Sequence, residues 1–323
     1  MKHTKALDGI RAVAILLVML FHFGYLPVGW VGVQIFFTLS GYLITGILLA
    51  ERERPFDTYI KTFLWHRALR ILPLLLFFLL ANACIYLATG HPDSFPNDWP
   101  WLAGFAANLA RMRTTDLGYC FVHIWSLAVE QQFYLIWPLL VYALSLRSLR
   151  QLVLGILLAE PLARAAMFSL ALYAGHDPQF AGKAVYVLPF TQFDAFAAGA
   201  AIPVFGLQHL GHPGRKLILA IVAAAVLGAA VLAQAYYSGT GAFIWSLGYA
   251  MFLVQSHGYV WAYSLLNVIS LLALICALRG MRAARFLELP VLAFVGRISF
   301  GMYVYHVPLL AFAGWLLQHC CQS

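Results

Sequence analysis

Long apolar runs separated by short polar connections dominate the sequence from Leu7 onward. A helix needs about 20 apolar residues to cross a bilayer, and these runs do not alternate as barrel strands do. The pattern predicts an all-α, polytopic transmembrane bundle of about ten helices, forming one integral-membrane domain over residues 1–323 without an appended soluble domain. We expect spans near residues 8–26, 30–50, 69–89, 122–145, 151–172, 186–207, 216–236, 259–277 and 290–317.

Two regions fit this pattern less well. The connection from Thr89 to Cys120 contains three prolines and the apolar stretch 101–110, which is too short to span and suits a surface or re-entrant helix. Residues 243–256 leave the topology of the last third open. If they do not cross, Arg279, Arg282 and Arg285 are cytoplasmic and the C-terminus lies outside; if they cross, those arginines lie outside.

Composition agrees with a membrane protein, because 63% of the residues are hydrophobic and only 10% are charged. The net charge of +8 does not indicate nucleic-acid binding, since the basic residues gather in alternate connections between spans. The positive-inside rule places the N-terminus in the cytoplasm. The first apolar run lacks a cleavage site and is expected to be retained. The five cysteines form no metal-ligand spacing, so we predict no metal.

The first predicted helix carries Asp8, Arg11 and His22 in an otherwise apolar segment. Arg11 and His22 share nearly one helix face at an axial separation of about 16 Å, so an Arg11 at the membrane boundary places His22 deep in the bilayer. Ionisable side chains at such depth usually face a cavity, and a neutral imidazole suits general base catalysis. The alternative is a histidine that only bonds a neighbouring helix.

A polar stripe opens the fourth predicted span, where four polar residues fall on one helix face: His123, Ser126, Glu130 and Tyr134. Glu130 lies at a depth similar to that expected for His22, so this carboxylate could orient an imidazole and stabilise its charged form. A structural polar clamp between helices is the alternative.

Arg67 and Arg70 share a face at the predicted start of the third span, where a helix N-terminus would add a positive field. Together these features suit the phosphates of a nucleotide such as coenzyme A. Anchoring to anionic lipid is an equally good explanation of their position.

Further polar residues occur inside the predicted spans. Glu160 and Arg164 have the i, i+4 spacing of a salt bridge, which makes mutual neutralisation their expected role. Asp194 has no partner within a turn, and His306 on the last predicted span could equally be an interface residue. The secondary site candidates are Asp8, Ser40, His123 and Asp194. Four glycines are expected to permit close helix packing: Gly32, Gly41, Gly46 and Gly301.

Four motifs in order make the chain resemble the membrane-bound acyltransferase-3 family of bacterial O-acyltransferases. They are LDGIRAVAILLVMLFH from Leu7, GVQIFFTLSGYLITGIL from Gly32, HIWSLAVEQQFYLIWPLL from His123 and FVGRISFGMYVYHVPLL from Phe294; HRALRILP from His66 and TQFDAFAAGA from Thr191 lie between them. The resemblance covers nearly the whole chain.

The resemblance implies roles for several residues. His22 would be essential for acyl transfer, Arg11 in the same motif would help to bind substrate or donor, and Arg67 and Arg70 would lie on the acyl-donor side. Trp125, Ser126 and Glu130 would belong to the core of the site, and Tyr134 and His306 complete the proposed binding residues. Two positions depart from the family pattern: Gln34, where an acidic residue is common, and Gln192, where a basic residue is frequent.

The resemblance also implies a reaction. Acyl-CoA, with acetyl-CoA as the expected form, would be a donor substrate and no cofactor would be bound permanently. The acceptor would be a hydroxyl of a carbohydrate or similar cell-surface molecule, at the bacterial inner membrane. His22 would act as the general base or carry the acyl group itself. A glycan transporter or flippase, or a ligand-sensing membrane protein, would also explain buried ionisable residues.

Overall fold

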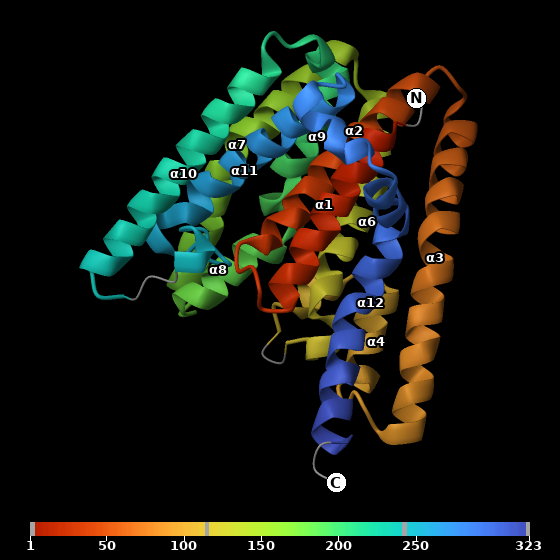
Figure 1. The fold of residues 1–323 in the computed structure, drawn as a ribbon. Coiled ribbons are helices and arrows are strands. Elements are labelled where there is room, and N and C mark those ends of the chain that lie inside the picture. Colours follow the sequence, from red (N-terminus) through yellow and green to blue (C-terminus); the bar gives the residue numbers. More distant parts are fainter. Residues whose placement is uncertain (1–3, 114–115, 241–243, 321–323) are drawn as a thin grey trace. The chain divides into compact units, whose positions relative to one another are not determined.

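The computed structural model describes residues 4–113, 116–240 and 244–320, and every regular element within these ranges is helical. This confirms the predicted all-α class. The α-helices are α1 Lys5–His22, α2 Gly32–Glu51, α3 Phe56–Thr89, α4 Phe95–Ala103, α5 Ala107–Ala110, α6 Trp125–Ala143, α7 Leu146–Tyr173, α8 Pro178–Val187, α9 Phe193–Phe205, α10 Pro213–Tyr237, α11 Gly258–Leu278 and α12 Pro290–Cys320. Figure 1 shows these helices in chain order.

Five helical segments of the described chain are long and apolar enough to cross a membrane, or six if one bent pair counts as a single span. They are 29–51, 56–89, 146–173, 213–237 and 255–278, and the bent pair joins 282–288 to 290–314 at 63°. Helices α1 and α6, which we predicted as spans, are outside this set. Three charged side chains occur within the 18 residues of α1, and Glu130 and two glutamines interrupt the apolar sequence of α6.

The chain divides into two compact units, each built from two stretches of sequence. Unit 1 comprises residues 1–52 and 139–299, and unit 2 comprises residues 53–138 and 300–323. The first boundary lies between α2 and α3, and the other two fall inside α6 and α12.

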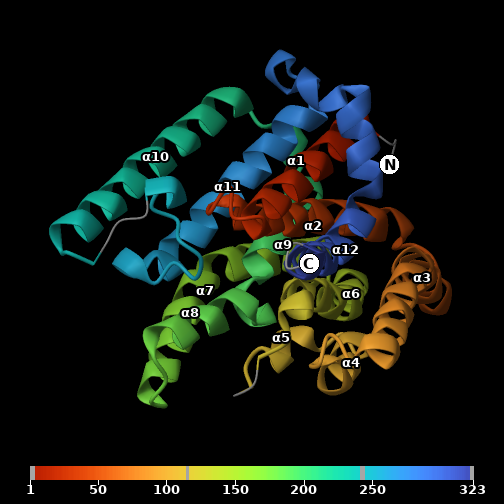
Figure 2. The same ribbon diagram turned by 60° about the horizontal axis from the view of Figure 1, so that its bottom comes forward.

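The interior of unit 1 depends on close contact between α2 and α9, which lie along each other in Figures 1 and 2. A Cβ atom added at Gly199 would lie 1.8 Å from the Thr38 carbonyl oxygen, and one at Gly41 would lie 2.0 Å from that of Phe196. Only glycine permits this approach. The close packing predicted for Gly41 is therefore confirmed.

Of the other predicted packing glycines, Gly32 and Gly301 give different results, and the role of Gly46 stays a prediction. A Cβ at Gly32 would lie 2.3 Å from the Ala14 carbonyl oxygen, so this close approach of α1 and α2 is confirmed. A Cβ at Gly301 would meet only a leucine methyl group at 3.7 Å, an ordinary contact, so the prediction for Gly301 is wrong.

The predicted continuous span 186–207 is broken into α8 and α9. Leu188 precedes Pro189 and adopts extended backbone angles, as the steric demand of a following proline favours. The Thr191 hydroxyl donates to the carbonyls of Val185 and Leu188, and the Gln192 amide also donates to Val185. Side chains thus satisfy backbone carbonyls that the missing helical turn would have used.

The ambiguous segment before α11 does not form a crossing helix. Residue 243 lies outside the described residues, but 244–257 contain only two short 3-10 turns, and Leu247, Phe252 and Leu253 all have positive φ angles. These angles are incompatible with a continuous α-helix. Of the two topologies left open, this favours the one in which the segment does not cross.

Unit 2 is organised around α3, which begins at Phe56 and not near residue 69 as predicted. Its 34 residues span about 50 Å, more than the hydrocarbon layer requires. The residues Phe56–Leu69 contain no proline or glycine, so nothing interrupts the helix before the apolar segment. In unit 2 the short helix α4 packs beside α3, as Figure 2 shows.

Candidate active site

His22 is the last residue of α1 and is partly exposed. Its Nδ1 lies 2.9 Å from the Val18 carbonyl oxygen. Because a carbonyl can only accept a hydrogen bond, Nδ1 carries the hydrogen, and in the neutral ring the basic lone pair is on Nε2. The helix therefore fixes both the tautomer and the orientation of this imidazole. The predicted helix extended to residue 26, but α1 ends at His22.

Arg11 and Asp8 form an ion pair one turn apart on α1, with 2.5 Å between Nη1 and Oδ1. The Asp8 side chain is 2% exposed and that of Arg11 is 15% exposed. This pairing neutralises both charges inside unit 1. Arg11 thus has a carboxylate partner on its own helix, which does not favour its predicted role in donor binding.

The two arginines of α3 differ in their surroundings. The Arg67 guanidinium lies over the rings of Phe63 and Tyr134, 5.7 Å from each centroid, whereas Arg70 is exposed. No carboxylate pairs with either arginine in the described part of the chain. Both therefore keep a positive charge that an anionic ligand could neutralise.

One part of the predicted phosphate site is wrong. Arg67 lies eleven residues inside α3, about 16 Å from its first residue, so the helix N-terminus does not contribute a positive field there. The prediction failed because residues 56–68, which include charged side chains, belong to the same helix as the apolar run that follows them.

Glu130 and Tyr134 form the centre of the predicted stripe on α6. The Tyr134 hydroxyl donates to Glu130 Oε1 at 2.6 Å, and the Tyr134 side chain is buried. A hydroxyl donor holds a carboxylate in one orientation. Trp125, the first residue of α6, is also buried.

His123 is not on this helix, because it belongs to the 3-10 turn Tyr119–Ile124 that precedes α6. Its Nε2 lies 3.1 Å from the Val304 carbonyl, and its ring lies 4.9 Å from that of His306. His306 Nδ1 lies 2.7 Å from the Tyr303 carbonyl. Both imidazoles are buried and donate to backbone carbonyls of α12.

Tyr303 connects this pair to the stripe and was not among the predicted site residues. Its hydroxyl donates to the His123 carbonyl at 2.6 Å and lies 2.5 Å from Ser126 Oγ. Because the tyrosine proton is used on the carbonyl, Ser126 is the donor to Tyr303. In the sequence Tyr303 is one of several polar residues in an apolar run, and only its spacing of three from His306 could have indicated a shared helix face.

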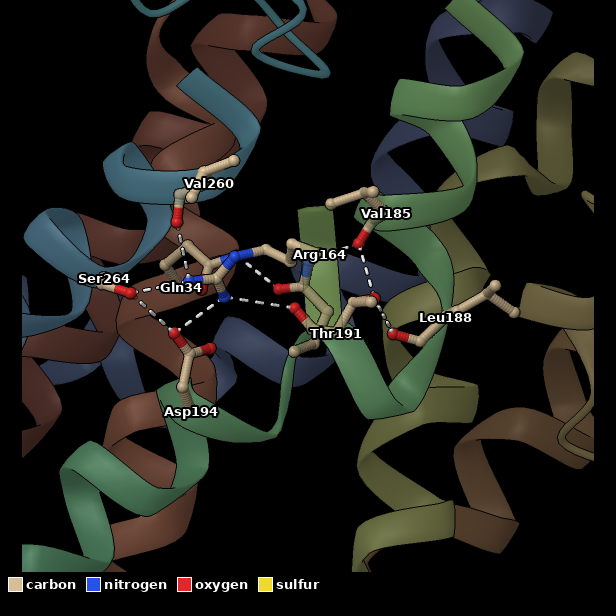
Figure 3. Close-up of polar contacts among 9 residues, drawn as sticks. Gln34, Arg164, Val185, Leu188, Thr191, Asp194, Val260 and Ser264 are labelled. Carbon is tan, nitrogen blue, oxygen red and sulfur yellow. Dashed lines mark hydrogen bonds and ion pairs between the residues drawn. The ribbon is translucent and has the colours of Figure 1, made fainter. Parts of the chain in front are cut away.

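Asp194 and Arg164 form a buried ion pair in unit 1, shown in Figure 3, with 2.8 Å between Nη1 and Oδ2. Arg164 also donates to the Ser264 hydroxyl, at 2.6 Å, and to the carbonyls of Val260 and Thr191. Arg164 thus forms its direct ion pair with Asp194 and not, as expected, with Glu160 among the described residues. The break before α9 directs Asp194 toward α7, an arrangement that the sequence spacing cannot reveal.

Three further positions singled out in the sequence lie in unit 1. Gln34 donates to Gln192 at 2.7 Å, so the two departures from the family pattern contact each other. Ser40 is buried on α2.

The site residues thus fall into two groups, since His22, Arg11, Asp8, Ser40 and Asp194 belong to unit 1 and the remainder to unit 2. Within unit 2, contacts connect Arg67, Tyr134 and Glu130, and separately Ser126, Tyr303, His123 and His306. The proximity of His22 to Glu130 stays a prediction.

Comparison with known proteins identifies the family. The sequence model of an acyltransferase domain matches residues 4–319, nearly the whole chain. The chain belongs to the acyltransferase-3 family. This confirms the resemblance inferred from the motifs.

Relatives of the chain are named as O-acetyltransferases. The chain is 27% identical over 337 residues to the peptidoglycan O-acetyltransferase OatA of Listeria monocytogenes, covering 98% of this chain and 51% of that protein. It is 23% identical over 333 residues to the O-acetyltransferase OatA of Staphylococcus aureus, covering 96% of this chain and 51% of that protein. The chain thus spans about half the length of these relatives. No solved structure matches it.

Proposed function

We propose that this chain is a membrane-bound O-acyltransferase that transfers an acyl group, most simply acetyl, from acyl-CoA to a hydroxyl of a carbohydrate or similar cell-surface acceptor. The match of the acyltransferase domain over residues 4–319 carries this proposal. The names of the relatives support acetyl as the group and a cell-wall glycan as the class of acceptor.

In the proposed mechanism, His22 Nε2 removes the proton from the acceptor hydroxyl. The hydroxyl oxygen attacks the thioester carbonyl, a carbon–oxygen bond forms, and the carbon–sulfur bond breaks. The proton on His22 then passes to the departing CoA sulfur, so the reaction has no net proton change. The hydrogen bond from Nδ1 to Val18 supports this assignment, because it leaves Nε2 as the basic atom.

Glu130 is proposed as the carboxylate that balances the charged imidazole. Arg67 and Arg70 are proposed to bind the donor phosphates, which is supported by the lack of a carboxylate partner among the described residues. The basic connections support a cytoplasmic N-terminus in a bacterial inner membrane, with the donor arriving from the cytoplasm.

A transporter or flippase is the second candidate, and the break between α8 and α9 is the observation that favours it. Broken helices commonly line substrate sites in transporters. Such a protein would move the acceptor without consuming a thioester.

The test uses purified protein in lipid nanodiscs, with acetyl-CoA and a soluble cell-wall glycan fragment. We expect free thiol and acetylated glycan to appear in equal amounts. Glycan transport into vesicles without thiol release would instead support the transporter.

A further inference from the structure

Among the residues that the structure describes, Arg67 is held by aromatic rings and not by a carboxylate. Phe63 lies one turn earlier on α3, Tyr134 comes from α6, and the two rings meet edge to face at 6.1 Å. The guanidinium lies 5.7 Å from both centroids, within the range of cation–π attraction. All three residues belong to unit 2. The rings therefore orient Arg67 while leaving its charge for an anion.

Tyr134 makes a second contact through its hydroxyl group. Its hydroxyl donates to Glu130 Oε1 at 2.6 Å, one helical turn earlier on α6. The side chain is only 5% exposed, so packing restricts both the ring and the hydroxyl to one position. A single buried residue thus contacts both a proposed phosphate-binding arginine and a proposed catalytic carboxylate.

We propose that Tyr134 is a positioning residue with two separable roles: its ring aligns Arg67 for the donor phosphates, and its hydroxyl fixes the carboxylate of Glu130 for the chemical step. This inference rests on the proposed acyl transfer and adds a physical link between donor binding and catalysis. Loss of the ring is expected to weaken donor binding, and loss of the hydroxyl to slow turnover.

The experiment measures kcat and KM for acetyl-CoA in purified protein. For Tyr134→Phe we expect kcat to fall about tenfold or more, since a hydrogen bond to a charged group is lost, while KM stays within about twofold. For Phe63→Leu we expect only KM to rise, by roughly threefold to tenfold. Tyr134→Leu should show both effects.

Tyr59→Phe is the matched control, because Tyr59 is a buried tyrosine of α3 whose hydroxyl donates to the Pro138 carbonyl and not to a proposed catalytic group. It should change neither constant. If Tyr134 acts through Glu130, Tyr134→Phe should lower kcat no further in a Glu130→Gln background. Should Tyr134→Leu fail to fold, the nearly isosteric Tyr134→Phe still decides the role of the hydroxyl.

An active wild-type enzyme whose Tyr134→Phe variant retains full kcat would overturn this inference alone. The same holds if kcat falls equally in Tyr59→Phe, since the loss would then reflect general packing. A wild-type protein that releases no thiol would overturn the proposed function together with this inference.

Discussion

Arg164 is the charged side chain of unit 1 that most needs polar partners, because its guanidinium is fully buried on α7, a helix long and apolar enough to span a membrane. Asp194, the Ser264 hydroxyl and two backbone carbonyls together replace its hydration. Removing one member of a buried ion pair leaves an uncompensated charge, which costs more than the pair contributes.

We therefore predict that Asp194→Asn lowers the free energy of unfolding by about 3–5 kcal/mol. The measurement is a denaturant titration of purified protein in detergent. Asp57→Asn is the control, because the Asp57–Lys61 pair is mostly exposed and contributes little. Equal stability of the Asp194 variant and the wild type would contradict a structural role for this pair.

Residue types and motif order identify most of the candidate residues in the sequence, including His22, Glu130 and Arg67. Which residues contact one another in the folded chain cannot be inferred from residue type and motif order. Glu160 has the right spacing for Arg164, yet Asp194 is the partner, since the break before α9 places it there. Similarly, Gln34 and Gln192 are 158 positions apart and only the fold shows that they form one hydrogen bond.

At the level of elements, α2 and α9 depend on glycine for their close contact. An added methyl group at Gly199 would overlap the Thr38 carbonyl, whereas Gly155 on α7 has open space around its Cα. The two positions therefore form a matched pair of helix glycines.

We predict that Gly199→Ala lowers the thermal unfolding midpoint of the purified protein, at a cost of about 1–3 kcal/mol from overpacking. Gly155→Ala should leave the midpoint unchanged or raise it slightly, because alanine is the better helix former. If both variants unfold at the same temperature, the close packing of α2 and α9 is not a source of stability.

Helix existence was predictable from hydrophobic run length, but helix ends and breaks were only partly so. The long runs give α2, α3, α7, α10 and α11 directly. The break at Pro189 was missed because the segments on its two sides, 178–187 and 193–205, are largely apolar and together have the length of a continuous span. The start of α3 at Phe56 was missed because the charged residues between 56 and 69 have the composition of a polar connection between spans.

For the whole molecule, the segment 244–257, which forms no α-helix, bears on the topology of the last third. If it does not cross, α10 and α11 form a simple pair, and the basic residues after α11 return to the cytoplasm. This agrees with the charge distribution in the rest of the chain.

We predict that, in a cysteine-free background, Tyr237→Cys reacts with a membrane-impermeant thiol reagent in intact cells. Arg285→Cys should react only after permeabilisation. Both positions are exposed, so access to the reagent depends on the side of the membrane. Labelling of Arg285→Cys in intact cells would mean that the segment crosses and that the C-terminal part has the opposite orientation.

The proposed mechanism depends on His22 as the base for acyl transfer. This role is tested most directly by measuring acetyl-CoA-dependent thiol release by purified wild-type and His22→Ala protein in nanodiscs. Loss of a general base predicts a fall in kcat of about 10²–10⁴-fold, with an unchanged unfolding midpoint because His22 is partly exposed at a helix end. Retention of wild-type thiol release by a folded His22→Ala protein would contradict the claim.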